Sequence, residues 1–169
     1  LEEVLTKFDL TLVENLGKFN NLPEVTPSQL LKETLEDNIP LAVAIATEKA
    51  RSELIVSPIL VAVRKHLNKQ ISLFSGMEFN VNIELGLTGF CDFIISRSNL
   101  QTIIQAPVVT LVEAKNNNIK SGFGQCLAEM VAAQIFNQNR GNQIPQIYGA
   151  ITTGTAWQFL ELEGQNVVL

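Results

Sequence analysis

Two charged residues close the most apolar stretch of the chain. Residues 108–114 (VVTLVEA) are almost continuously apolar, which predicts a strand covered on both faces. Glu113 and Lys115 are two residues apart, so they would project from the same side of that strand. Asp92 belongs to the strand predicted before it, and its carboxylate converges with that of Glu113 if the two strands are neighbours. Converging carboxylates are ligands that a hard cation such as Mg²⁺ prefers.

These residue types fit the metal-assisted hydrolysis of a phosphate ester. Mg²⁺ or Mn²⁺ held by Asp92, Glu113 and the Ala114 carbonyl would acidify a bound water and screen a phosphate. Lys115 would orient that water or stabilise charge that develops on the phosphate. The alternative is an ordinary Lys–Glu ion pair at a strand end, with Asp92 in a turn, because motifs this short often match by chance. Residue types and spacing alone leave both interpretations open.

The periodicity of apolar residues and the capping signals predict three helices, over about 26–37, 41–67 and 121–139. The first starts with Thr26 as its N-cap and stops before Pro40. The second is kinked or broken at Pro58, because proline inside a helix removes a hydrogen bond. The third follows the strand that ends near Glu113.

The strand signals are an alternating segment over 79–85 and apolar runs over 90–96, 108–114, 146–152 and 156–162. The order helix, three strands, helix, two strands favours an α/β fold with a mixed central β-sheet flanked by helices. We expect residues 1–169 to form a single domain with an N-terminal extension over about 1–40.

Two motifs resemble the signature of the PD-(D/E)XK, or restriction-endonuclease-like, superfamily of nucleases. GFCDFIIS, which contains Asp92, and VVTLVEAK, which contains Glu113 and Lys115, resemble its G-x-x-D … E-x-K pattern. SGFGQCLAEMVAAQIFNQ places Gln125 where many members carry a glutamine close to the active site. TEKARSELIVSPIL and YGAITTGTAWQFLEL are similar to segments in nuclease domains of restriction-enzyme subunits. The resemblance covers roughly residues 41–163.

The resemblance implies a restriction-endonuclease-like core and Mg²⁺-dependent hydrolysis of DNA phosphodiester bonds. The metal would be bound by Asp92 and Glu113, and Lys115 would assist the attacking water. Glu48 and Gln125 would support the site, and Glu53 is a second choice for the helix carboxylate, although its spacing from Lys49 is that of a surface ion pair. Two features depart from the pattern. The proline expected before Asp92 is absent, and Glu129 stands where one branch of the superfamily has a tyrosine.

The overall charge of the chain gives weight to a second hypothesis. The formal net charge is −5, whereas proteins that bind nucleic acid usually carry a basic patch. A catalytically silent member of the same fold, acting in protein interaction or assembly, would need no such patch. A nuclease subunit that relies on a second copy or on a larger nuclease complex to grip DNA would also reconcile the carboxylates with the charge.

The cellular setting follows from what the sequence lacks. No apolar run approaches the roughly 20 residues of a membrane span, so we expect no membrane insertion. The mixed, acidic start LEEVLTKFDL does not resemble a signal peptide, which favours a reducing cytoplasm. In that compartment Cys91 and Cys126 are expected to be small buried apolar residues, because two isolated thiols form neither a zinc site nor a disulfide framework.

Overall fold

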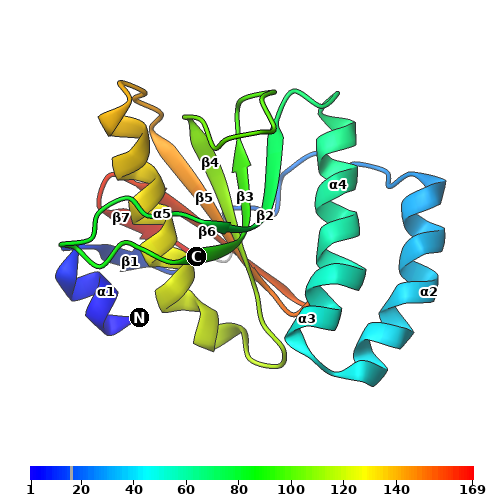
Figure 1. Cartoon of the computed structure of the whole chain (residues 1–169). Coiled ribbons are helices and arrows are strands. Elements are labelled where there is room, and N and C mark those ends of the chain that lie inside the picture. Colours follow the sequence, from blue (N-terminus) through cyan, green and yellow to red (C-terminus); the bar gives the residue numbers. More distant parts are fainter. Residues whose placement is uncertain (16) are drawn as a thin grey trace.

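A seven-stranded mixed β-sheet forms the centre of the computed structural model, which describes residues 1–15 and 17–169 (Figure 1). The strands lie in the order β1-β7-β6-β5-β4-β3-β2. β2, β3, β4 form an antiparallel meander, β5 lies parallel to β4, and β6 is antiparallel to β5. The strands are β1 (Thr11–Val13), β2 (Ser72–Glu78), β3 (Phe90–Ser96), β4 (Val108–Ala114), β5 (Gln146–Thr152), β6 (Trp157–Glu163) and β7 (Asn166–Val168).

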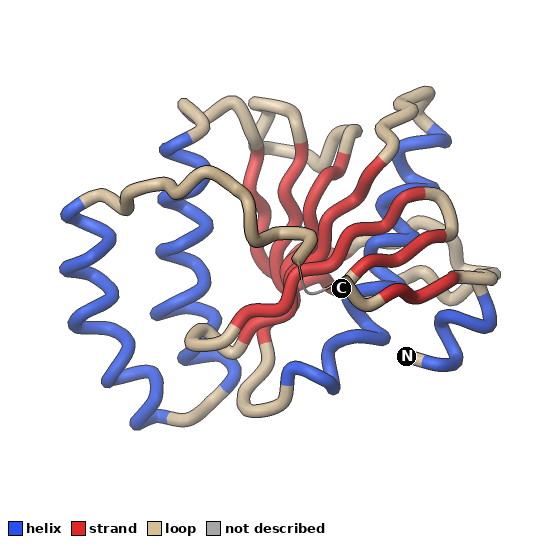
Figure 2. The backbone as a smooth tube through the Cα atoms, turned by 180° about the vertical axis from the view of Figure 1, so that it is seen from behind, coloured by secondary structure: helices blue, strands red, loops and turns tan. Residues whose placement is uncertain are grey.

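Helices cover both faces of the sheet (Figure 2). α5 packs on one face, and α4 packs on the other beside β2, with α2 on the outer side of α4. The helices are α1 (Glu2–Lys7), α2 (Gln29–Ile45), α3 (Glu48–Arg51), α4 (Ser57–His66) and α5 (Phe123–Asn139), together with a π-helical turn η1 (Ser52–Val56) and a 3-10 turn η2 (Ile119–Gly122). The predicted α/β class and the helix-flanked mixed sheet are therefore confirmed.

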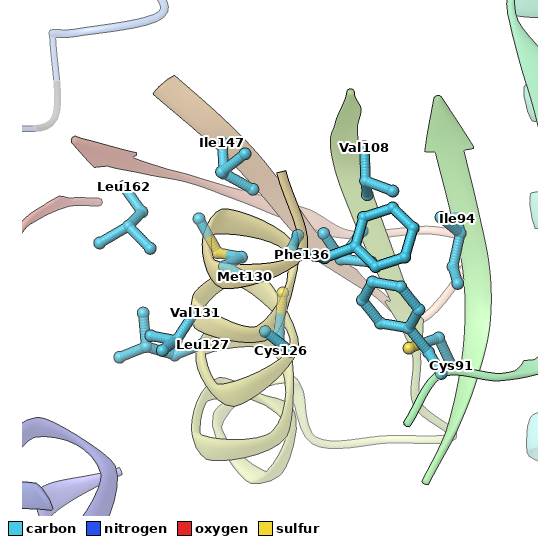
Figure 3. Close-up of a cluster of buried hydrophobic side chains, with 14 of the residues drawn as sticks. Cys91, Ile94, Val108, Cys126, Leu127, Met130, Val131, Phe136, Ile147 and Leu162 are labelled. Carbon is cyan, nitrogen blue, oxygen red and sulfur yellow. The ribbon is translucent and has the colours of Figure 1, made fainter. Parts of the chain in front are cut away.

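The larger core lies between α5 and the sheet (Figure 3). Leu127 and Met130 of α5 are fully buried against Ile147 and Leu162, which the sheet contributes. Cys91 and Cys126 are both buried and unbridged, as expected for small apolar residues. A smaller core on the opposite face contains Val112 of β4, so β4 is covered on both faces, as its continuous apolar run predicts.

The order of elements along the whole chain differs from the predicted order of helix, three strands, helix, two strands. The chain begins with α1 and β1 and ends with β7, which pairs in parallel with β1. Before α4 the chain forms α2, which corresponds to the helix predicted over 26–37, and the short helix α3. The predicted N-terminal extension thus includes a sheet strand.

The predicted boundaries of the first two helices are wrong. α2 starts at Gln29 with Ser28 as its N-cap, because the Ser28 hydroxyl accepts a hydrogen bond from Leu31 N at 3.3 Å. α2 then runs through Pro40 to Ile45. It lies on the surface with only Ala42 buried, so the loss of one helical hydrogen bond is tolerated.

The helix over 41–67, predicted to be kinked or broken at Pro58, is broken earlier, at Ala46 and Thr47. Ala46 adopts a left-handed conformation that ends α2, and Thr47 caps α3 by accepting from Ala50 N at 3.1 Å. Pro58 cannot donate to the carbonyl of Leu54. That carbonyl instead accepts a hydrogen bond from the Asn38 side chain of α2 at 2.9 Å, and the chain widens into η1 at this point.

The strand predicted over 79–85 is also wrong, because β2 occupies the preceding residues and 79–89 form a loop. Phe79 N bonds to Gly89 O at 2.7 Å, and Val81 N bonds to Leu87 O at 2.9 Å. Phe79 and Leu87 are buried in the core, whereas Ile83 is 84 % exposed. The alternating pattern arises because a loop also anchors itself with some apolar side chains.

Candidate active site

The charged residues predicted from the sequence gather at one edge of the sheet. β4 and β5 are parallel, so their carboxyl ends meet at this edge, where Lys115 N donates to Thr152 O at 2.7 Å. β3 is antiparallel to β4 and begins at the same edge, which brings Asp92 close. The Asp92 carboxylate accepts a hydrogen bond from Ala114 N at 2.8 Å. The strands that carry Asp92 and Glu113 are therefore neighbours, as the convergence argument requires.

Glu113 is the most deeply buried charged group of this edge, with 1 % of its surface exposed. One carboxylate oxygen forms an ion pair with the Lys115 ammonium, and the other, Oε2, has no hydrogen-bond partner. Burial raises the pKa of Glu113 to about 7, against the hydrogen bond from Lys115, and the nearby charges of Asp92 and Glu48 add to the rise.

Lys115 is held by two acceptors. Besides Glu113, its Nζ donates to Gln125 Oε1 at 3.3 Å. Burial lowers the pKa of Lys115, but the hydrogen bond and the charge of Glu113 outweigh burial, so the pKa lies above its ordinary value. Lys115 is therefore a protonated ammonium group at neutral pH. The contact between Lys115 and Glu113 is expected both for an ordinary ion pair at a strand end and for a catalytic site.

Glu129 extends this chain of side chains on α5. Gln125 Nε2 donates to Glu129 Oε1 at 3.2 Å, which leaves the Gln125 oxygen turned towards Lys115. Burial raises the pKa of Glu129 to about 8, and repulsion from Glu113 adds to the rise. Its second oxygen, Oε2, is buried without a partner. Glu129 lies four residues after Gln125, so the sequence predicts their contact on one helix face, but it does not predict that Glu129 is buried.

Glu48 lies at the start of α3, where its side chain is exposed to solvent. It lines a pocket of about 270 Å³ together with Asp92 and Ala114. The structure thus places Glu48 beside the predicted metal ligands. Glu53 lines the same pocket, and it pairs with Lys49 at 2.6 Å, as its spacing predicts.

Arg51 is a residue that sequence reasoning did not single out. Only 9 % of its surface is exposed, although it carries a permanent charge. Its Nη1 donates to Thr153 O at 2.9 Å, and its Nε donates to Asn116 Oδ1 at 3.3 Å. Its position at the end of the short helix α3 gives no signal in the sequence, because arginine at a helix end is usually a surface residue.

The donor set suits a hard cation only in part. Among residues 1–15 and 17–169, no three or more side chains of His, Cys, Asp or Glu are grouped as a ready-made metal site. The two carboxylates of Asp92 and Glu113 are oxygen donors, and Mg²⁺ is often held by one or two carboxylates plus water and substrate phosphate. The unpartnered Oε2 of Glu113 is a buried donor atom that a cation would satisfy. On that observation the two carboxylates fit part of the coordination of a divalent ion, with water and phosphate as its remaining ligands.

Comparison of the chain with protein-family models, curated proteins and solved structures returned no match. None of the helices in the described residues combines the length and the apolar character that a bilayer crossing needs.

Proposed function

We propose that this protein is a metal-dependent nuclease of the PD-(D/E)XK type that hydrolyses DNA phosphodiester bonds with Mg²⁺ or Mn²⁺. The observation that carries the proposal is the meeting of Asp92, Glu113 and Lys115 at the carboxyl ends of β4 and β5, with one Glu113 oxygen buried and unpartnered. Buried ionisable groups with strongly shifted pKa values concentrate at functional sites.

Each residue has a defined part in the proposed reaction. Asp92 and Glu113 would hold the cation, with the Ala114 carbonyl as a further ligand. The bound cation supplies an acidified water and positive charge beside the phosphate. Lys115 presents its ammonium group to the negative charge that develops on the phosphate, and the Gln125 oxygen fixes the direction of that ammonium group. Glu48 lines a pocket with Asp92 and Ala114, and it would bind a water there.

The net charge of −5 favours the second candidate, a catalytically silent module that acts in protein interaction or assembly. A nuclease that depends on a second copy or on a larger complex for its DNA grip is compatible with the same charge. The two candidates differ in whether the carboxylates bind metal and whether DNA is cut.

Metal binding by calorimetry, followed by a cleavage assay, tests the proposal. Asp92→Asn and Glu113→Gln keep the shapes of the side chains but remove their charges, and we expect both to abolish Mn²⁺ binding. Glu36→Gln, on the exposed surface of α2, is the matched control and should bind like the wild type. Lys115→Met should keep metal binding and lower plasmid cleavage by about 100-fold. Absence of metal binding and of cleavage in the wild type would leave the silent module as the better account.

A further inference from the structure

Arg51 places a permanent positive charge in a nearly closed environment without an acidic partner. In the described part of the chain, no Asp or Glu lies within ion-pair distance of its guanidinium. Both of its hydrogen bonds go to neutral acceptors, the Asn116 side chain and the Thr153 carbonyl. Removing an unpaired charge from water is unfavourable, so a cation in this position is usually matched by an anion.

The guanidinium has donors left for such an anion. It carries five N–H groups, of which two are used in the contacts to Asn116 and Thr153. Nη2 makes no hydrogen bond within the described residues and is not one of the fully buried atoms that lack a partner, so its two N–H groups reach solvent. Two segments of the chain thus hold Arg51 through Nε and Nη1, and Nη2 remains available to a ligand. The guanidinium fork matches two oxygens of a phosphate.

Arg51 lies beside the catalytic residues of the proposed site. Asn116 directly follows Lys115, and Thr153 directly follows Thr152, whose carbonyl accepts from Lys115 N. Both contacts are therefore at the carboxyl ends of the parallel strands β4 and β5. In open α/β sheets, ligands bind in the crevice outside these strand ends. In Figure 1 the connection from β4 to α5 passes beside α3 at this edge.

We propose that Arg51 is the phosphate-binding residue of this edge, and that it binds a phosphate group through its free guanidinium donors. The inference deepens the proposed nuclease function, since it supplies a positive contact for nucleic acid in an acidic chain. The phosphate is that of a nucleic-acid backbone or a free phosphate ion, which share the same oxygen chemistry. Binding through Arg51 does not require the metal.

Thermal unfolding in EDTA, with and without inorganic phosphate at matched ionic strength, tests the inference. At phosphate concentrations near tenfold its dissociation constant, the wild type should gain about 3–5 °C in Tm. Arg51→Lys and Arg51→Gln should lose this gain. Arg64→Gln is the matched control, because Arg64 also donates to a backbone carbonyl, that of Ile71 at 3.1 Å, but at the far end of α4. An equal gain in the Arg51 and Arg64 variants would overturn the proposal.

A second arm identifies the source of the phosphate. Fluorescence-detected binding of a single-stranded thymidine oligonucleotide in EDTA should weaken about tenfold in Arg51→Gln but not in Arg64→Gln if the ligand is a phosphodiester. Loss of inorganic-phosphate binding with no change for the oligonucleotide would assign the site to free phosphate. Because neither arm contains metal, both can succeed in a protein that does not cut DNA.

The Arg51 variants could fail to fold, since Arg51 joins three segments. The wild-type protein then provides the test through the Nε–H resonance of Arg51 in a proton–nitrogen NMR spectrum. Titration with phosphate should shift that resonance to saturation and leave the Arg64 resonance in place. A resonance of Arg51 that does not respond to phosphate would refute the assignment.

Discussion

Replacing Glu129 by glutamine should stabilise the protein at neutral pH. The pKa of Glu129 is raised from 4.5 to about 8 in the folded protein, chiefly by burial. The unfolded chain keeps the ordinary pKa. Between pH 4.5 and about pH 8 the unfolded chain therefore binds fewer protons than the folded chain, and stability falls as pH rises. The ionisation of Glu129 alone lowers the free energy of unfolding by less than ~1 kcal/mol at pH 5 and by ~3 kcal/mol at pH 7. Glutamine has nearly the same shape and does not ionise.

Urea unfolding at pH 5 and pH 7, followed by the fluorescence of Trp157, measures this effect. Trp157 is the only tryptophan of the chain, so its signal reports directly on the sheet that contains it. The free energy of unfolding of Glu129→Gln should exceed that of the wild type by up to ~3 kcal/mol at pH 7 and by less than ~1 kcal/mol at pH 5. Glu36→Gln, an exposed carboxylate on α2, should show no such change between the two pH values. A Glu129→Gln variant that is no more stable than the wild type at pH 7 would refute the reasoning.

Two further substitutions test the packing that supports the site. Gly149→Ala should destabilise the protein by about 1–3 kcal/mol, because a Cβ there would lie 2.5 Å from Met130 Sδ and 2.9 Å from Cys126 Sγ; an unchanged urea midpoint would show that α5 can move aside. Asn137→Leu should cost about 2–4 kcal/mol in urea unfolding, because the Asn137 amide bonds both backbone groups of Val108, at 2.7 and 2.8 Å. The exposed Asn139→Leu is its control, and equal stability of the two variants would contradict this role.

The parts of the fold that were predictable are those where local pattern and burial agree. β3 and β4 occupy the predicted residues because both are apolar runs bounded by turn residues. The strand predicted over 79–85 is absent because the alternation there reflects Phe79 and neighbouring residues anchoring a loop, not strand pairing. The course of the segment 41–67 was only half predictable. Pro58 signals the irregularity that appears as η1, but the break lies at Ala46 and Thr47, and the Asn38 side chain that satisfies Leu54 O belongs to another helix.

The candidate site likewise contains some residues that the sequence could predict and others that it could not. Asp92, Glu113 and Lys115 could be placed together because the spacing in one strand and the pairing of two neighbouring strands determine their positions. Arg51 was not predictable, because its two partners lie 65 and 102 residues further along the chain. Glu129 was seen as a neighbour of Gln125, but its raised pKa depends on burial that only the assembled sheet and α5 create.

The buried carboxylates bear on the choice between a nuclease and a silent module. Glu113 is almost completely buried and keeps one oxygen unpartnered, which is unfavourable for a group that contributes only to folding. A silent module could carry apolar residues in place of both Glu113 and Lys115, and replacing a buried ion pair in this way is often neutral or stabilising. A cation site needs that oxygen free and requires the carboxylate to ionise, which a metal charge promotes by lowering the pKa of Glu113 from about 7. The unfavourable burial of an unpartnered Glu113 oxygen therefore supports the metal-dependent function over the silent module.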